Sequence, residues 1–367
     1  MNNPGSIFLT GVTGTLGREM LRTLLVERDV KIYLLARRKT RFSHWDRVRK
    51  ILAGWNMEKF LGTRIEVLEG DVTLPSFGLR EHEIETLRRD VAEFYHIAAL
   101  TALNGTEADC RKINIGGTDE ALRMALDFRR KGVLDRFFYF STAYVAGSKQ
   151  VYTSHEDGLP EKPAFANFYE SSKFASESHV RSAMKEGLPA TIFRPSIVVG
   201  HSQTGEVSEF NVIYPFIRLF AHGMIKLLPS RLQNSFNIVP IDFVIKASAA
   251  IARRRDSIGH TYHLVSPEPP TVDMLMQLRR ELPDVPEILL ISPEDFARER
   301  LNTNEQFVYD ILEPYLGYLN GGLSFDASNT QRALEGTGIA FPKTDLNFLR
   351  VLLRYAIDQK YLALQPI

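Results

Sequence analysis

The chain has 367 residues and carries 45 basic and 44 acidic side chains, which gives a formal net charge of +1 at pH 7. Hydrophobic residues make up 44% of it, a composition that is typical of a folded globular protein and excludes a disordered chain. The balanced charge argues against nucleic-acid binding. Cys110, the single cysteine, excludes an intrachain disulfide and a thiolate metal cluster.

The same features predict where the protein resides. A single cysteine fits a reducing cytoplasm. The N-terminal residues do not combine a basic segment with an apolar one, and no apolar run approaches the roughly 20 residues that cross a bilayer. We therefore expect a cytoplasmic protein without stable membrane insertion, and we predict neither a metal nor a nucleic acid as its ligand.

The first predicted elements are a strand over residues 7–9 and a helix that follows it, with a glycine-rich turn between them. Gly11, Gly14 and Gly17 recur at three-residue intervals in the stretch FLTGVTGTLGREML. A helix N-terminus offers unpaired N–H groups and a positive dipole end, and glycine lets a phosphate approach the backbone closely. The turn is therefore a predicted phosphate site, although a turn that merely packs closely has the same pattern.

The rest of the first half alternates apolar runs with helical patterns. This alternation predicts a Rossmann-like, doubly wound α/β fold with a parallel sheet and a ligand at the carboxyl ends of the strands. Beyond Gly200 the alternation weakens, and the apolar stretch from Phe210 to Leu228 predicts a long helix. The predicted strands cover residues 31–36, 64–69, 93–99, 137–140 and 191–193, and the predicted helices cover residues 44–61, 121–128 and 169–185.

This change of pattern predicts two domains. Residues 1–200 are expected to form a dinucleotide-binding Rossmann domain, and residues 201–367 a smaller, mainly helical substrate-binding lobe. Some later segments are expected to pack back on the first domain. No low-complexity linker separates the two parts, so we expect them to share a cleft.

Two side chains of a predicted helix have the spacing of a proton-transfer pair. Tyr169 and Lys173 stand four residues apart in NFYESSKFASE, so both project from one face of the helix. An ammonium near a phenol favours the phenolate, so Lys173 is expected to lower the pKa of Tyr169. The strand over residues 137–140 ends in Ser141 and Thr142, which puts a hydroxyl at the same sheet edge. Together these groups could protonate a substrate oxygen and stabilise negative charge on it.

These motifs give the chain a family resemblance. Over roughly residues 6–200 it resembles the extended short-chain dehydrogenases/reductases, and the motifs occur in the order that this family has them. The motifs are Gly11-x-x-Gly14-x-x-Gly17, Gly70-Asp71-Val72, His96-Ile97-Ala98-Ala99, Asn114-x-x-Gly117-Thr118, Ser141-Thr142, Tyr169-x-x-x-Lys173 and Arg194-Pro195-Ser196.

The resemblance implies a role for each matching residue. Tyr169 is the expected catalytic acid/base, Lys173 holds the nicotinamide ribose, and Thr142, with Ser141 as second choice, binds the substrate carbonyl. The other residues that the resemblance places at the cofactor are Gly11, Thr13, Gly14, Thr15, Leu16, Gly17, Asp71, Val72, Ala98, Ala99, Asn114, Pro195, Ser196 and Ile197.

The residues that end the second strand indicate which cofactor binds. A fold that selects NAD usually places an acid there for the ribose 2′-OH, whereas a 2′-phosphate favours arginine. Here the strand ends in Leu34-Leu35-Ala36-Arg37-Arg38, so NADPH is the predicted cofactor, with Arg37 or Arg38 on the 2′-phosphate. Seven of the fourteen residues from Arg37 to Lys50 are basic, so this stretch could also start a solvated helix or receive an anionic substrate carrier.

Within the family, the chain is most similar to the fatty acyl-CoA reductases and the carrier-protein thioester reductases. The stretches STAYVAG, RPSIVVG and FNIVPIDFVIKA carry this resemblance. It implies an NADPH-dependent reduction of an acyl thioester, bound to coenzyme A or to a carrier protein, to an aldehyde or an alcohol. The apolar stretch after Phe210 could line an acyl channel, although such a helix more often fills a core. Acyl chain length and oligomeric state are left open.

Three alternatives remain. An aldehyde, ketone or sterol reductase would use every residue named so far. A nucleotide-sugar epimerase of the same superfamily would keep NAD bound, which Arg37 and Arg38 argue against. A module that senses dinucleotides without catalysis is disfavoured because Tyr169 and Lys173 are both present.

Overall fold

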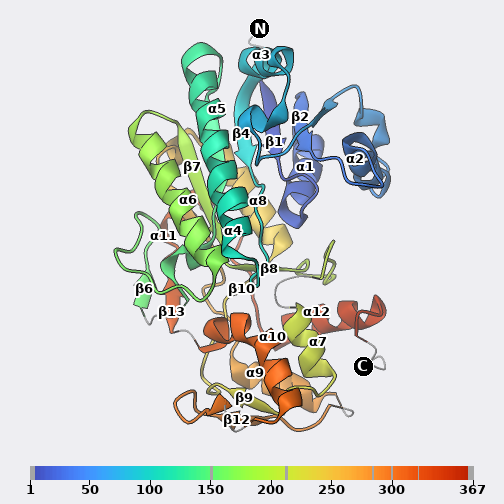
Figure 1. The fold of residues 1–367 in the computed structure, drawn as a ribbon, viewed down its shortest axis with the longest axis vertical. Coiled ribbons are helices and arrows are strands. Elements are labelled where there is room, and N and C mark those ends of the chain that lie inside the picture. The colour runs from blue at the N-terminus through green and yellow to red at the C-terminus, as the bar shows by residue number, and fades with distance from the viewer. Residues whose placement is uncertain are drawn as a thin grey trace.

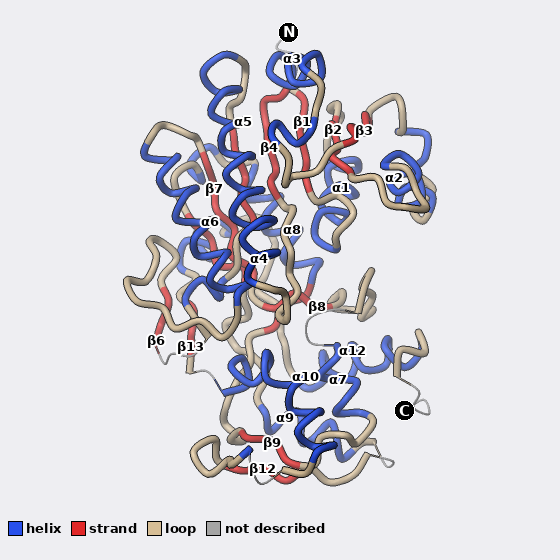
Figure 2. The backbone as a smooth tube through the Cα atoms, in the orientation of Figure 1, coloured by secondary structure: helices blue, strands red, loops and turns tan. Residues whose placement is uncertain are grey.

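The fold is an α/β layer that stands above a smaller lobe made mainly of helices (Figure 1). This computed structural model describes residues 5–148, 152–210, 214–282, 285–298, 301–320 and 322–362. Figure 2 shows the strands of the α/β layer running through its centre with helices around them. Among the described residues, no helix is both long and apolar enough to cross a membrane.

The α/β layer is built on one parallel sheet of seven strands. Their order across the sheet is β11-β7-β5-β4-β1-β2-β3, and every pairing is parallel. This order confirms the predicted doubly wound Rossmann-like fold. The strands are β1 (Ser6–Thr10), β2 (Ile32–Ala36), β3 (Ile65–Glu69), β4 (Val91–His96), β5 (Arg136–Phe140), β7 (Ala190–Pro195) and β11 (Thr261–Leu264).

Helices cover both faces of this sheet because side chains alternate along each strand. In β1, Ile7 and Leu9 pack into one apolar core, and Phe8 packs into the core on the opposite face. The helices of the first face are α1 (Thr15–Glu27), α2 (His44–Ala53), α8 (Ile241–Ala252) and α11 (Ser328–Leu334). Those of the second are α3 (Glu81–Asp90), α5 (Gly117–Lys131) and α6 (Phe168–Lys185). A short helix α4 (Glu107–Cys110) continues as a π-helical turn over Arg111–Gly116 into α5.

The smaller lobe encloses a core of its own, in which apolar side chains of its helices meet. Its helices are α7 (Tyr214–Ala221), α9 (Val272–Arg280), α10 (Thr303–Asn320) and α12 (Leu346–Asp358), with the strand pair β9 (Leu227–Pro229) and β12 (Leu289–Ile291). Two further parallel pairs lie between the lobe and the sheet: β8 (Ile197–Val199) with β10 (Ile238–Pro240), and β6 (Tyr152–Ser154) with β13 (Leu323–Phe325). Turns of 3₁₀ helix cover Glu58–Phe60, Pro75–Gly78, Ala143–Ala146 and Arg255–Ser257.

Several elements beyond residue 200 belong to the α/β layer. Strand β11 pairs with β7, and α8 and α11 pack on the sheet. The predicted division at residue 200 therefore does not coincide with the end of the sheet in sequence, although the packing-back of later segments was expected. The division of roles between the two parts stays a prediction.

Two predicted helices are shorter than their sequence patterns indicate. The helix expected over residues 44–61 ends at Ala53, because Gly54 follows it and the chain then forms a 3₁₀ turn. The single helix expected from Phe210 to Leu228 is wrong: α7 ends at Ala221, Gly223 takes a left-handed conformation with φ +65°, and β9 follows. Three residues of that expected helix, Asn211, Val212 and Ile213, lie outside the described residues.

A buried ion pair joins the sheet to α6, the helix that carries Tyr169 and Lys173. Arg194 of β7 and Glu177 of α6 are both 0% exposed, and they contact each other through two hydrogen bonds of 3.0 and 2.5 Å. Arg194 also donates to three carbonyl groups, those of His155, Glu156 and Gly158 in the loop before α6. Burial acts to raise the pKa of Glu177, but the charge and hydrogen bonds of Arg194 outweigh it and hold that pKa at about 2.

We expect Glu177→Gln to lower the free energy of unfolding by about 3–5 kcal/mol at pH 7, because it leaves the buried Arg194 charge uncompensated. Folding lowers the pKa of Glu177 from 4.5 to about 2, so the contribution of the pair is complete above 4.5 and is lost as the pH falls toward 2. Urea unfolding at a series of pH values across this range measures the contribution of the pair to the free energy of unfolding. The exposed pair of Glu69 with Arg38 is the control, because Glu69→Gln should change the midpoint little. Equal midpoints for the two variants would contradict the prediction.

Candidate active site

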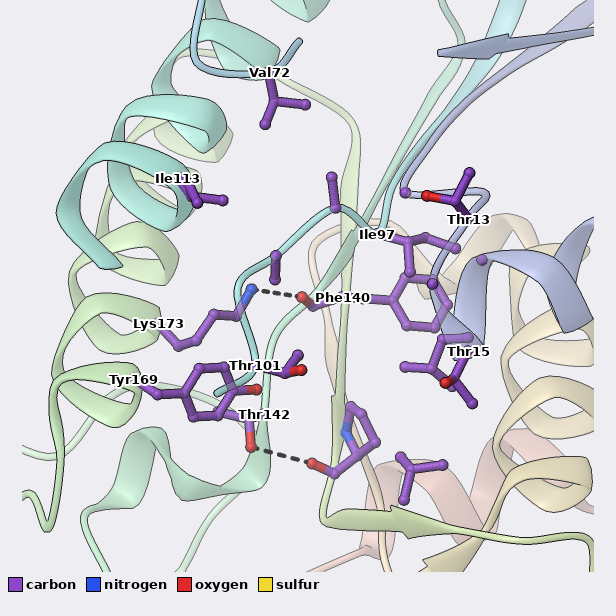
Figure 3. A pocket seen from close by; sticks show the side chains of 18 of the residues that line it. Thr13, Thr15, Val72, Ile97, Thr101, Ile113, Phe140, Thr142, Tyr169 and Lys173 are labelled. Atoms are coloured by element: carbon purple, nitrogen blue, oxygen red, sulfur yellow. Dashed lines mark hydrogen bonds between the residues drawn. The ribbon is translucent and has the colours of Figure 1, made fainter. Parts of the chain in front are cut away.

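A pocket of about 400 Å³ opens at the carboxyl edge of the sheet, and Tyr318 of α10 in the smaller lobe is among the residues that line it. Residues that follow β1, β2, β4, β5 and β7 line it, and α6 closes one side with Tyr169 and Lys173. Figure 3 shows these two side chains projecting from one helix toward Thr142 and Phe140. The parallel sheet brings the ends of these strands together, as the fold predicts.

The glycine turn between β1 and α1 is shaped by close backbone packing. Gly11 has φ +80°, and a Cβ there would lie 2.6 Å from the backbone nitrogen of Ala98. A Cβ on Gly17 would lie 2.2 Å from the carbonyl oxygen of Gly11. At Gly14, the N-cap of α1, the nearest atom to an added Cβ is at 3.4 Å. Packing therefore requires glycine at the first and third positions, whereas the second faces the open pocket, at the helix N-terminus where a phosphate can bind.

Cations gather at the end of the pocket beyond β2. Arg37, Lys39 and Arg47 line this end. The side chain of Arg47 donates to the carbonyl oxygen of Arg37 at 2.8 Å, and burial followed by the Arg37 charge lowers the pKa of Arg47. Arg38 does not line the pocket, because its guanidinium pairs with Glu69 at 3.0 Å on the surface.

The proton-transfer group lies at the other end of the pocket. Thr142 follows β5 and caps the next 3₁₀ turn, and its hydroxyl donates to the carbonyl oxygen of Pro195 at 3.3 Å (Figure 3). The Lys173 ammonium is buried and donates to the Tyr139 hydroxyl at 2.8 Å and to the carbonyl oxygen of Phe140 at 2.7 Å. Tyr169, Thr142 and Lys173 thus share one wall.

The expected lowering of the pKa of Tyr169 by Lys173 is wrong for this structure. Burial raises the pKa of Tyr169 to about 12, and the Thr142 hydroxyl only partly opposes this. Burial also lowers the pKa of Lys173 to about 7, against the opposing charge of Glu177. The Lys173 ammonium is directed to Tyr139 and to the strand end, and the groups that shift the pKa of Tyr169 are its own burial, Thr142, Glu170 and Cys110. The phenol is therefore a proton donor at neutral pH.

Asn114 lies outside the pocket lining and connects two of the segments that form the site. Its side chain accepts from the backbone nitrogen of Leu100 at 2.7 Å and donates to the carbonyl oxygen of Leu100 and to the Ser172 hydroxyl of α6. It thereby fastens the loop after β4 to the helix that carries Tyr169. Asn114 does not itself line the pocket.

The loop after β8 reaches the glycine turn from the C-terminal half of the chain. The Ser208 hydroxyl donates to the Thr15 hydroxyl at 3.1 Å. Glu209 lines the pocket and acts to raise the pKa of Arg47, so it faces the cationic end. The base of this loop is fixed by Ser202, whose backbone nitrogen donates to Asp242 of α8 at 2.8 Å.

The structure brings most of the predicted site residues to this pocket. Those that line it are Gly11, Thr13, Gly14, Thr15, Leu16, Gly17, Arg37, Val72, Ala98, Ala99, Thr142, Tyr169, Lys173, Pro195, Ser196 and Ile197. Arg38, Asp71 and Asn114 do not line it. Asp71 instead accepts from Arg37 at 3.3 Å and from the backbone of Thr73, so it holds the side chain of a lining residue. The roles of all these residues remain predictions.

Sequence reasoning missed part of the lining. Lys39 and Arg47 lie within the basic stretch that the sequence singles out, so a signal for them was present. Glu209 and Tyr318 gave no signal, because only the folding of the C-terminal half brings them to the pocket. The other lining residues not predicted are Leu35, Ala36, Gly70, Ile97, Thr101, Leu103, Ile113, Phe140, Tyr144 and Val198, together with Ser141, the second choice for the carbonyl-binding hydroxyl.

The pocket fits a nicotinamide dinucleotide on physical grounds. The turn excludes side-chain carbon at Gly11 and Gly17 and leaves the N-terminus of α1 open at Gly14. The buried Ser196 hydroxyl also lines the pocket and has no hydrogen-bond partner among the described residues. The pocket therefore combines a turn that can bind an anion with an unpaired polar group.

Comparison with known proteins now decides the family. A family model described as "Male sterility protein" matches residues 9–248, well over half of the chain. The chain belongs to this family. Its fold and motifs make it an extended short-chain dehydrogenase/reductase, a family whose members bind a nicotinamide dinucleotide, which confirms the resemblance stated from sequence.

The curated relatives that this chain matches are much longer proteins. It is 28% identical over 270 residues to a component of linear gramicidin synthase from Brevibacillus parabrevis, a match that covers 73% of this chain and 5% of that protein. It is 30% identical over 287 residues to nonribosomal peptide synthetase asaC of Aspergillus flavus, and this match covers 73% of this chain and 27% of that protein. The L-2-aminoadipate reductase large subunit of Penicillium chrysogenum is 27% identical to it, and this match covers 69% of this chain and 19% of that protein.

Solved structures match this chain over almost its whole length. The terminal R domain from the myxalamid PKS-NRPS biosynthetic pathway is 29% identical with a TM-score of 0.82, and the match covers 99% of this chain and 93% of that one. A UDP-glucuronic acid 4-epimerase from Bacillus cereus, solved with NAD, is 18% identical with a TM-score of 0.66. This match covers 97% of this chain and 99% of that one. The second likeness shows the shared fold alone.

The glycine turn can be tested by separating packing from phosphate binding. We expect Gly17→Ala to lower the free energy of unfolding by about 2–3 kcal/mol, because the added carbon meets the Gly11 carbonyl. Gly14→Ala should cost no more than about 1 kcal/mol, yet weaken binding of the dinucleotide by tenfold or more (about 1.4 kcal/mol). Chemical denaturation and a fluorescence titration with NADPH measure the two effects. Normal NADPH affinity in Gly14→Ala would show that no phosphate binds at that position.

Proposed function

We propose that this enzyme is an NADPH-dependent reductase that transfers hydride to the carbonyl of an acyl thioester. The observation that carries the proposal is Tyr169, a neutral phenol, beside Thr142 in a pocket whose far end is cationic. The names of the relatives support the thioester, since they include nonribosomal peptide synthetases and an R domain from a PKS-NRPS pathway. The products would be an aldehyde, an alcohol or both.

The charges at the cofactor end support NADPH over NADH. Arg37, Lys39 and Arg47 line the pocket beyond β2, where the 2′-phosphate of NADPH would lie. Asp71 holds the Arg37 side chain at 3.3 Å, and no acid lies on β2 to bind a ribose 2′-OH. Lys173 would hold the nicotinamide ribose, and Ser196 would face the nicotinamide end.

The reaction would combine the bound cofactor with Thr142 and Tyr169 of the pocket wall. The bound cofactor supplies a hydride to the carbonyl carbon. Thr142 and Tyr169 hold the carbonyl oxygen with two hydroxyls, and Tyr169 gives it a proton as negative charge develops. When the resulting hemithioacetal collapses, its hydroxyl proton returns to Tyr169 as the C=O bond re-forms, the C–S bond breaks, and the leaving sulfur takes up a proton from solvent, so that a thiol leaves with an aldehyde. The raised pKa keeps Tyr169 protonated for the first proton transfer, to the carbonyl oxygen.

We also propose a division of roles along the chain. Residues 1–200 would hold the cofactor, and residues 201–367 would shape the acyl site, with Tyr318 of α10 as the contact between them. The acyl group would be supplied on coenzyme A or on a carrier protein. In the basic stretch over 37–50, Arg37 and Arg38 already pair with Asp71 and Glu69, so such a carrier would have to compete for these two charges.

A second candidate is a reductase of free aldehydes. It is favoured by the likeness to aldehyde reductase lnaA of Aspergillus flavus, at 25% identity over 96% of this chain and 36% of that protein. The pocket chemistry is the same for both candidates, because each protonates a carbonyl oxygen. They differ only in whether a thiol is released.

The thioester proposal is tested by following NADPH oxidation and free thiol together, with acyl-CoAs and the matching aldehydes. Release of one thiol per aldehyde formed is expected. We expect Tyr169→Phe to lower kcat about 100-fold or more with little change in NADPH affinity. Tyr33→Phe is the control, because Tyr33 is buried and bonded to Asp90 away from the pocket. Turnover of aldehydes without any thioester reduction would support the second candidate instead.

The cofactor proposal is tested at the cationic end. We expect Arg47→Ala and Arg37→Ala each to raise KM for NADPH about tenfold or more and to change KM for NADH little, because NADH lacks the 2′-phosphate. Arg49→Ala removes the same charge from α2, but Arg49 stacks on Trp45 outside the pocket, so neither KM should change. Equal effects on the two cofactors would contradict the assignment of these arginines.

A further inference from the structure

The two ends of the pocket differ in charge. At the cofactor end, Arg37, Lys39, Arg47 and Glu209 line it. Around Tyr169, the lining consists of hydroxyl, aliphatic and aromatic side chains. Among the described residues, these are Thr101, Leu103, Thr142, Tyr144 and Tyr318, and the nearby Lys173 ammonium is already bonded to Tyr139 and Phe140.

Tyr318 brings the smaller lobe to this end of the pocket. Its ring lies edge-on to Tyr144, with ring centres 4.6 Å apart and an angle of 88°. Its hydroxyl accepts a hydrogen bond of 3.0 Å from Asn167, the N-cap of α6. The preceding residue, Gly317, allows this approach, since a Cβ there would lie 3.2 Å from the Ser148 hydroxyl. The ring of Tyr318 is thus fixed both by packing and by a hydrogen bond.

A buried carboxylate lies near the Tyr318 hydroxyl. Glu170 is 0% exposed and does not line the pocket. Its carboxylate accepts from the backbone nitrogens of Ala166 at 2.9 Å and Ser148 at 3.3 Å. Burial raises the pKa of Glu170, and a hydrogen bond with the Tyr318 hydroxyl opposes this. Tyr318 therefore lines the pocket, and its hydroxyl interacts with the Glu170 carboxylate, which does not line the pocket.

We propose that Tyr318 is a specificity-determining residue that restricts the acyl site to uncharged acyl groups by separating it from Glu170. The proposal rests on the proposed thioester reductase function. A charged acyl group would lose its water against Leu103, Tyr144 and Tyr318 without a partner of opposite charge. A hydrocarbon chain buries apolar surface against the same rings.

The first experiment compares two substrates of equal size. S-heptanoyl-pantetheine and S-(6-aminohexanoyl)-pantetheine have the same number of heavy atoms in the acyl chain and differ in charge. With NADPH, we expect kcat/KM for the heptanoyl thioester to exceed that for the aminohexanoyl thioester about tenfold or more. Equal values would overturn this inference and leave the proposed function standing. If neither thioester releases thiol, the proposed function itself fails.

Variants of Tyr318 test whether this residue causes the preference for the uncharged thioester. Tyr318→Phe keeps the ring and should keep the preference. Tyr318→Ala opens the site toward Glu170, so the preference should shift tenfold or more toward the aminohexanoyl thioester (about 1.4 kcal/mol). Adding Glu170→Gln to Tyr318→Ala should remove this shift. Tyr315→Ala, on the same helix but outside the pocket lining, should leave the preference unchanged.

The preference is a ratio measured on one enzyme preparation, so a loss of folded protein does not alter it. An unchanged ratio in Tyr318→Ala would overturn the role of this residue. The same shift in Tyr315→Ala would show a general loosening of α10 rather than separation from Glu170. If Tyr318→Ala does not fold, the wild-type ratio and the Tyr318→Phe ratio still decide whether the site selects uncharged groups.

Discussion

The parallel pairing of all seven strands in the main sheet is the constraint on which the site depends. Parallel strands end at one edge, so residues far apart in sequence meet there without any long excursion of the chain. Gly11 follows β1, Arg37 follows β2, Ala98 follows β4 and Thr142 follows β5, and all four line one pocket. The glycine turn then fits because the Gly11 carbonyl and the loop after β4 leave no room for side-chain carbon.

Buried polar contacts keep α6 in register with this edge. Glu177 is tied to Arg194 of β7, Ser172 is tied to Asn114, and Asn167 caps the N-terminus. Each contact costs desolvation and is stabilising only because its partners are in place. Tyr169 and Lys173 lie between these anchors, so the helix holds both at the pocket wall.

The two ends of the pocket carry different chemistry. The end beyond β2 gathers guanidinium and ammonium groups that can face phosphate, and the end at Tyr169 is neutral and largely aromatic. This separation suits a reaction in which a highly charged cofactor meets an uncharged carbonyl. A low-polarity environment also keeps the phenol protonated, which favours proton donation during reduction over proton removal.

The sequence by itself determined the fold class, the glycine turn and the placement of Tyr169 and Lys173 on one face of a helix, because these depend on local periodicity and on spacing within one element. It also indicated the cationic end, since Arg37, Lys39 and Arg47 lie within one basic stretch. Only the tertiary structure decided that Arg38 turns to Glu69, that Lys173 is held by Tyr139, and that Glu209 and Tyr318 reach the pocket. These outcomes depend on contacts between segments tens to hundreds of residues apart, and local spacing carries no information about which side chains will meet there.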